Sequence, residues 1–97
     1  LNPYLAQAVM LAAGLKGIED ELSLPPATTG DVYAATQAAD IPQTLRAATE
    51  TLRNSTFLRE CLGEAVVDHY TRAAEWEQEE FDRVVTDWEI ARGFERA

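Results

Sequence analysis

The sequence is poor in residues that form disulfides or bind soft metals, with one cysteine and one histidine among 97 residues. A lone Cys61 cannot form an internal disulfide, which suits the reducing cytoplasm. His69 is the one other soft ligand, whereas a structural zinc site takes about four. We therefore predict a cytoplasmic chain with a partly buried Cys61, a surface-facing His69 and no metal-binding residues.

Basic residues are also few: 8 Lys and Arg stand against 17 Asp and Glu, for a net charge of -9 at pH 7. A negative surface repels phosphate backbones and anionic lipid headgroups. The charge therefore argues against nucleic acid and against a membrane surface as partners. It favours solubility and tolerates a basic partner.

No apolar run is long enough to cross a bilayer. The longest runs from Tyr4 to Leu15, is interrupted by Gln7, and has no basic leader before it. Charged residues close it, namely Lys16, Glu19, Asp20 and Glu21. We predict a buried helix of a soluble protein rather than a membrane span or a signal peptide.

Alternation of apolar and polar residues, the mark of a strand, is not found in any convincing stretch, and no repeat appears. The expected fold class is all-α, with a buried N-terminal helix and a long C-terminal helix as the main elements. The prolines and glycine of LSLPPATTGD predict a loop after the first helix. The helices that we expect cover residues 3–22, a turn within 31–36, 45–53, 56 to about 63, 64–85, and a short last helix after 86.

Residues that cap helices stand before most of these segments. Asn2 precedes Pro3, a good first helical residue, and Thr44 precedes Leu45. Ser55 is the next expected cap. Thr86 and Glu89 have the spacing of a capping box, in which each side chain bonds the other residue's backbone amide.

The apolar positions predict which side of each helix is covered. The first helix is apolar on nearly all sides, as a helix packed between two layers would be; one stripe is Leu5, Ala8, Val9, Ala12, Leu15 and Ile18. On the other helices the expected inner residues are Leu45, Ala48, Leu52, Val67, Tyr70, Ala74, Phe81 and Val85, with Trp88 continuing them. If Trp88 is fully buried, its change to Ala should cost about 3–5 kcal/mol.

Carboxylates recur at helical spacing, at Glu60, Glu64 and Asp68 and again at Glu75 and Glu79. Stacked carboxylates can hold metals in helical bundles, but such sites also need Glu-x-x-His pairs, which this sequence does not contain. A solvated acidic face is the better interpretation. Arginines near enough to neutralise some of these acids are Arg59, Arg72 and Arg83.

Other catalytic patterns are missing too. GLKG matches no phosphate-binding loop, and neither Ser23 nor Ser55 has an identifiable base. Trp76, Phe81 and Trp88 could stack a base or a sugar, yet at helical spacing they are more often core or a subunit contact. The residues alone thus predict an acidic helical unit with no catalytic, cofactor-binding or metal-binding residue.

Three stretches together resemble the glutamine synthetase family. NPYLAQAVMLAAGLKGIEDEL is similar to the segment after its last catalytic strand, and LPPATTGDVYAA to the loop that follows. FLRECLGEAVVDHYTRAAEWEQEEFDRVVTDWEIARGFERA resembles its C-terminal end, in the branch of γ-glutamylpolyamine synthetase-like enzymes. The resemblance covers nearly the whole chain, and NPYLA followed by AAGL is its most specific part.

The resemblance implies an ATP-dependent ligase that joins the γ-carboxylate of glutamate to ammonia or another amine. Such enzymes use Mg or Mn and form rings of subunits with active sites between neighbours. Their metal, ATP and substrate ligands precede the NPY segment, so none is carried over to this chain. Residues 1–97 would be the C-terminal helical part of an α+β catalytic domain, with the rest of that domain and neighbouring subunits as partners in a homo-oligomer.

This part would have a structural role, backing the catalytic sheet, and alone would be inactive. The first helix would lie between that sheet and the later helices, so the isolated chain should self-associate through Leu5, Val9, Leu11 and Leu15. The missing initiator Met fits an excised or proteolysed piece. The alternative is an independent acidic α-helical protein-interaction module. The ending RGFERA departs from the family's more aromatic end and leaves the amine substrate open.

Overall fold

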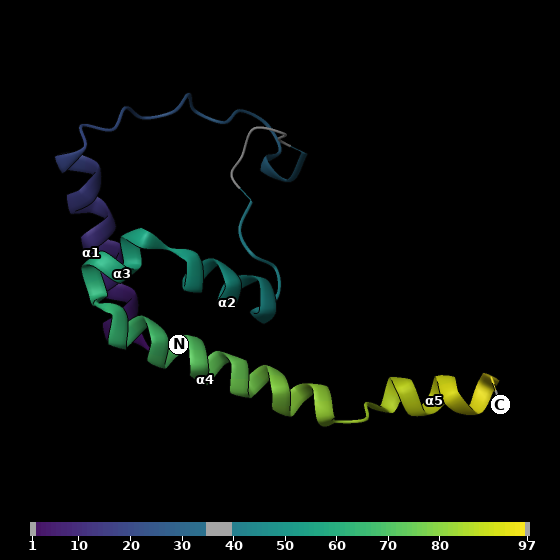
Figure 1. Cartoon of the computed structure of the whole chain (residues 1–97). Coiled ribbons are helices and arrows are strands. Elements are labelled where there is room, and N and C mark those ends of the chain that lie inside the picture. The colour runs from purple at the N-terminus through teal and green to yellow at the C-terminus, as the bar shows by residue number, and fades with distance from the viewer. Residues whose placement is uncertain (1, 35–39, 97) are drawn as a thin grey trace.

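The structure, a computed structural model, describes residues 2–34 and 40–96. These residues form five α-helices and one 3-10 turn and contain no strand, which confirms the all-α class. The elements are α1 (Pro3–Glu19), η1 (Val32–Ala34), α2 (Leu45–Asn54), α3 (Thr56–Leu62), α4 (Glu64–Arg83) and α5 (Asp87–Arg96) (Figure 1). The expected turn within residues 31–36 is η1, although positions 35 and 36 lie outside the described residues.

The predicted caps are all formed. The Asn2 side-chain oxygen accepts from the amides of Tyr4 and Leu5, at 3.0 and 3.2 Å. Thr44 and Ser55 cap α2 and α3 in the same manner. Before α5, the Thr86 amide donates to the Glu89 carboxylate at 2.8 Å, and the Glu89 amide donates to the Thr86 hydroxyl at 3.3 Å. These bonds satisfy amides that have no partner within the helix.

The first helix ends at Glu19, three residues before the predicted end at Leu22. The amide of Leu22 donates to the carbonyl of Gly17, and that of Glu21 to Ile18, which is the Schellman pattern. Glu21 takes the left-handed conformation that this pattern requires, with φ of 51°. The chain therefore turns away from the helix axis before Leu22.

The helices contact one another in successive pairs and do not surround one common hydrophobic core. α2 and α3 both lie against α4, and α3 also lies against α1. Val67 of α4 is the one fully buried large apolar side chain of the described residues, at 1% exposure. The other buried side chains are Thr49 and Thr71. The expected inner residues Leu45 and Ala48 are exposed instead, and Thr49 is the buried residue of α2.

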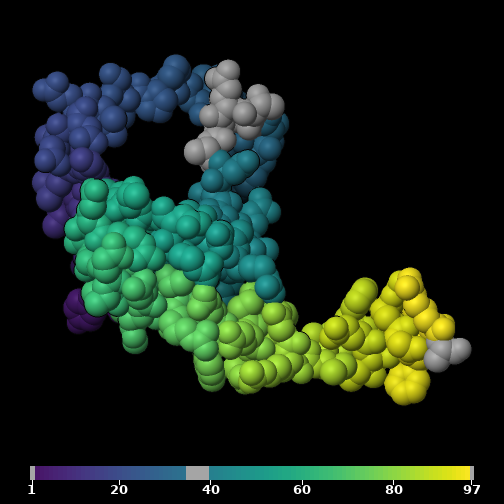
Figure 2. Space-filling view, viewed as in Figure 1, coloured from purple at the N-terminus to yellow at the C-terminus, as the bar shows by residue number. Residues whose placement is uncertain are grey.

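The molecule is extended, measuring 60 × 41 × 22 Å. Its radius of gyration is 18.6 Å, against about 13 Å for a compact domain of this length. α5 projects beyond the end of α4 and stands apart from the other helices (Figures 1 and 2). Residues 20–34, which follow α1, also run away from the other helices (Figure 1).

The projection of α5 overturns one set of predicted core residues. Phe81, Val85 and Trp88 are exposed, with Trp88 at 69%. After Arg83 the backbone becomes extended, so α5 does not continue the covered side of α4. The expected loss of 3–5 kcal/mol in the Trp88→Ala variant assumed burial, and it does not apply to this structure.

The N-terminal helix is covered on one side only, which corrects the expectation of a buried helix. Leu5, Val9 and Ala12 are partly buried on the side toward α3, and no residue of α1 is fully buried. The side chains of Tyr4, Leu11, Leu15 and Ile18 remain exposed. Leu5 and Val9 are therefore less available for self-association than the sequence predicts.

No helix within residues 2–34 and 40–96 is both long and apolar enough to span a bilayer.

Candidate functional site

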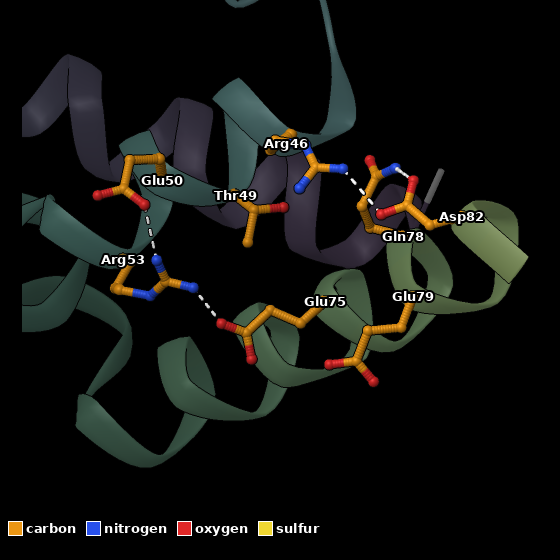
Figure 3. A pocket seen from close by; sticks show the side chains of 8 residues that line it. All are labelled: Arg46, Thr49, Glu50, Arg53, Glu75, Gln78, Glu79 and Asp82. Atoms are coloured by element: carbon orange, nitrogen blue, oxygen red, sulfur yellow. Dashed lines mark hydrogen bonds and ion pairs between the residues drawn. The ribbon is translucent and has the colours of Figure 1, made fainter.

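A charged groove of about 410 Å³ lies between α2 and α4 (Figure 3). Both helices turn polar side chains toward one another along this seam. Its lining residues are Arg46, Thr49, Glu50, Arg53, Glu75, Gln78, Glu79 and Asp82. The groove brings arginine, carboxylate, amide and hydroxyl side chains together. How these groups are paired decides what chemistry they could support.

Ion pairs across the seam connect the two helices. Arg46 binds Asp82 at 2.8 Å, and Arg53 binds Glu75 of α4 as well as Glu50 of its own helix. The Gln78 amide donates to the other Asp82 oxygen at 2.8 Å. These two hydrogen bonds hold the pKa of Asp82 below its usual range. The bond from Gln78 has the larger effect, and the bond from Arg46 has the next largest.

The carboxylates Glu75 and Glu79 of the groove also face Arg72. Arg72 binds Glu79 at 3.1 Å and Glu75 at 3.4 Å. The hydrogen bond to Glu79, with its charge, raises the pKa of Arg72. The groove is a polar contact between helices, and its exposed pairs are each worth about 0–1 kcal/mol.

The first carboxylate stack is also neutralised by an arginine. Arg59 binds Asp68 at 2.9 Å and also binds Glu64. The hydrogen bonds that Arg59 donates to Asp68 and to Glu64, of which the first has the larger effect, raise the pKa of Arg59. Arg83 pairs with Glu80 in the same way, so all three predicted arginines contact acids. Within residues 2–34 and 40–96 no three His, Cys, Asp or Glu side chains come together as a metal would need.

Cys61 and His69 lie on different surfaces. Cys61 is exposed, which corrects the predicted partial burial, and it lines a shallow groove between α1 and α3. His69 is exposed, as predicted, and lies edge-on to Tyr70 with ring centres 5.3 Å apart. The two side chains line no common groove, so they are not arranged as ligands of one ion.

Two open, mostly apolar grooves run along α4, and both include His69 and Tyr70. One, of about 460 Å³, lies against the start of α1 and is lined by Asn2, Tyr4, Leu5, Ala65, Val66, His69 and Tyr70. The other, of about 780 Å³, continues along the helix and is lined by Leu45, His69, Tyr70, Arg72, Ala73, Ala74, Trp76 and Glu77. The residue-based reasoning missed this surface, although Val66, Tyr70, Ala73 and Trp76 have helical spacing.

Comparisons with known proteins agree on one family. The model of the glutamine synthetase catalytic domain matches residues 1–93. A gamma-glutamylethanolamide synthetase of Streptomyces coelicolor is 49% identical over 96 residues, which are 99% of this chain and 21% of that protein. A glutamine synthetase of Thermus thermophilus is 41% identical over 98 residues, covering 94% of this chain and 22% of that protein.

A glutamine synthetase of Methanosarcina mazei is 36% identical over 98 residues, again covering 94% of this chain and 22% of that protein. The chain thus spans about a fifth of the length of the curated relatives it matches.

Proposed function

The chain belongs to the glutamine synthetase family, and from this membership we propose that it is the C-terminal helical part of the catalytic domain of an ATP-dependent ligase. The whole enzyme joins the γ-carboxylate of glutamate to ammonia or another amine. ATP first phosphorylates the carboxylate, which turns a poor electrophile into one with a good leaving group. The match over residues 1–93 carries this proposal.

The role of the segment itself is structural. Its carboxylates at Glu64, Asp68, Glu75, Glu79 and Asp82 are bound by arginines, so the described residues do not fit an Mg or Mn site or the phosphates of ATP. The ligands for metal, nucleotide and glutamate belong to the rest of the domain. The segment supports that part from behind and contributes to contacts between subunits of a cytoplasmic homo-oligomer.

The amine is best sought among primary amines larger than ammonia. The relative with 49% identity is named a gamma-glutamylethanolamide synthetase, and the relatives named glutamine synthetase in the comparison above are 41% and 36% identical. An alkylamine fits the same chemistry, because any unprotonated primary amine can attack the acyl phosphate. Ethanolamine and short polyamines are therefore the first amines to test.

A chimaeric enzyme tests the proposal. The stretch of the Streptomyces coelicolor relative that aligns with this chain is replaced by residues 1–97, and phosphate release from ATP is measured with glutamate, magnesium and an amine. We expect amine-dependent turnover by the chimaera and none by the isolated chain. An inactive but folded chimaera would argue against the ligase assignment. Turnover by the highly purified isolated chain would instead contradict the purely structural role of this segment.

The rival function, an independent acidic interaction module, rests on the exposed apolar side of α1. It predicts that residues 1–97 do not replace the relative's own segment. The chimaera therefore separates the two functions.

A further inference from the structure

We propose that α2 is a hinged helix, which swings away from α4 about Ser55 when the ion pair between Arg46 and Asp82 breaks. In the closed position α2 lies on α4, as in this structure, and in the open position it remains helical but leaves the seam. Salt is the condition that shifts α2 from closed to open. The motion is a property of the helices themselves and does not depend on the ligase function.

α2 buries little apolar surface against α4. Thr49 is its one buried residue, and Leu52 and Arg53 are half-buried. The groove of about 410 Å³ lies between the two helices, so the seam is not closely packed along its length. Elements with few buried apolar contacts open most readily. The polar contacts across the seam therefore decide whether α2 stays on α4.

Two ion pairs cross the seam, and they lie at opposite ends of the groove (Figure 3). Near the end of α2, Arg53 binds Glu75, and their side chains are 39% and 33% exposed. At the start of α2, Arg46 binds Asp82, and their side chains are 70% and 48% exposed. Salt screens exposed charges more strongly than partly buried ones. Rising salt should therefore weaken the pair at the start of α2 before the pair at its end.

The end of α2 is fixed to α3. Ser55 both ends α2 and caps α3, so the two helices share this one extended residue. The Arg59 side chain of α3 donates through Nε to the Arg53 carbonyl oxygen at 2.9 Å, and it also binds Asp68 of α4. These bonds hold the last turn of α2 in place, which makes Ser55 the pivot.

The start of α2 has no comparable anchor within the described residues. All of residues 20–34 and 40–44, which precede α2, are exposed. Arg46 lies nine positions before Ser55, which is about 13 Å along a helix. A rotation about Ser55 therefore moves the start of α2 most, and the pair between Arg46 and Asp82 restrains that end.

Thr71 favours the open position. Thr71, Glu75, Gln78 and Asp82 are four, three and four residues apart, so Thr71 lies on the side of α4 that faces α2. Thr71 is 6% exposed, and its hydroxyl has no hydrogen-bond partner among the described residues. Burying a hydroxyl without a partner disfavours the state that buries it. Movement of α2 away from α4 returns this hydroxyl to water, which brings the open position closer in free energy to the closed one.

Distances between pairs of nitroxide labels, measured by double electron–electron resonance, test the proposal. Labels at Ala47→Cys and Phe81→Cys report the separation of α2 from α4, because both positions are exposed and lie outside the groove. Labels at Glu60→Cys and Phe81→Cys report the separation of α3 from α4 and serve as the control. Both pairs are placed in the 97-residue Cys61→Ser chain, at a concentration where sedimentation shows a monomer.

We expect Asp82→Asn to raise the ratio of open to closed α2 by about two- to fivefold, the effect of losing one exposed ion pair. A rise in salt from about 0.01 M to about 1 M should do the same in the wild type and have little effect on Asp82→Asn. Glu77→Gln is the matched control, because it removes the same charge from a residue of α4 that does not line the seam. Adding Thr71→Val to Asp82→Asn should lower the ratio by about fivefold or more.

Equal ratios in Asp82→Asn and Glu77→Gln would overturn the hinged helix, as would an equal response of the wild type and Asp82→Asn to salt. A parallel change in the distance between the labels at positions 60 and 81 would indicate general loosening of the chain, and it would also overturn the proposal. Far-ultraviolet circular dichroism of each variant completes the test. A loss of helix that accompanies opening would show that α2 unfolds and does not swing.

Discussion

Asn2 and Tyr70 lie 68 positions apart in the chain, yet the Asn2 amide nitrogen donates to the Tyr70 hydroxyl oxygen at 3.0 Å. The same Asn2 side chain accepts from the amides of Tyr4 and Leu5 through its oxygen. One residue therefore begins α1 and fixes that beginning against α4. Removal of the Asn2 side chain abolishes both the cap of α1 and the bond to Tyr70, whereas removal of the Tyr70 hydroxyl abolishes only the bond between the two residues.

The two roles of Asn2 predict different losses of stability. Tyr70→Phe should lower the free energy of unfolding by about 0.5–1 kcal/mol, because it removes one exposed hydrogen bond. Asn2→Ala should cost about 1 kcal/mol more, since it also removes the cap. Asn2→Ser keeps a capping oxygen and should resemble Tyr70→Phe. Urea unfolding of the single variants and of the double variant Asn2→Ala/Tyr70→Phe gives the interaction energy between the two side chains. Fully additive losses of stability would show that the hydrogen bond between Asn2 and Tyr70 contributes nothing.

The left-handed backbone at Glu21 predicts a stabilising substitution. A side chain at φ of 51° is strained, and glycine is the residue that accepts this conformation without cost. Glu21→Gly should raise the free energy of unfolding by about 0.5–1 kcal/mol. Glu21→Ala is the control, because it removes the charge and keeps the strain. A glycine variant no more stable than the alanine variant would contradict the Schellman ending of α1.

The capping box of α5 predicts a loss of helix in acid. Hydrogen bonds from the Thr86 amide and then the Thr86 hydroxyl hold the pKa of Glu89 below its usual range. A lowered folded-state pKa stabilises the helix above the unfolded value of about 4.3, and this contribution disappears as pH falls through the lowered value. Carbon chemical shifts of residues 87–96 should therefore lose helical character below about pH 4.3.

The matched control for the acid effect is Glu89→Gln, since glutamine can also complete a capping box. This variant should show no such change between neutral and acidic pH. If the wild type and the Gln variant lose α5 helix over the same acid range, the carboxylate of Glu89 is not the responsible group.

The uncovered side of α1 predicts that the isolated chain self-associates. Tyr4, Leu11, Leu15 and Ile18 are the residues to bury, and covering a large aliphatic side chain is worth roughly 1.5–3 kcal/mol. The charge of -9 opposes pairing, but salt screens it over about 8 Å at physiological ionic strength. Association should strengthen as salt rises, measured by sedimentation equilibrium. Leu11→Glu should abolish it, and Phe81→Glu should not.

A strict monomer at high micromolar concentration in both low and high salt would contradict this prediction. Equal association of the Leu11→Glu and Phe81→Glu variants would place the contact elsewhere on the chain.

Local chemistry made much of the fold predictable. A cap depends on residues within one turn, so Asn2, Thr44, Ser55 and the pair Thr86–Glu89 were identified from their spacing and all form. The absence of strands in the described residues follows from the missing alternation. The pairs Arg72–Glu75 and Arg83–Glu80 follow from i,i+3 spacing on one helix. Arg59 binds Glu64 and Asp68 across the break between α3 and α4, which helical spacing alone does not give.

The tertiary faces were less predictable. Phe81, Val85 and Trp88 continue an apolar pattern, but the extended backbone after Arg83 redirects α5, and the spacing of apolar residues carries no signal for that. Thr49 and Thr71 are buried, whereas the expected inner residues Leu45 and Ala48 are exposed. The apolar pattern could not predict a seam that two threonines and ion-paired side chains form. Neither the residue chemistry nor the motif resemblance predicted the groove between α2 and α4, and the resemblance gave the family alone.

The separation between Asn2 and Tyr70 has a consequence during translation. At roughly 5–20 residues per second, a ribosome needs about 3–14 s to add the intervening residues. For that interval a nascent α1 has neither α3 nor α4 to cover it. In a longer chain whose sheet is synthesised before α1, the apolar side chains of α1 can pack on that sheet as soon as the helix leaves the ribosome. When translation starts at residue 1, these side chains stay exposed and bind chaperones first. Production of the isolated segment should therefore depend more strongly on trigger factor-like holdases than production of a longer chain.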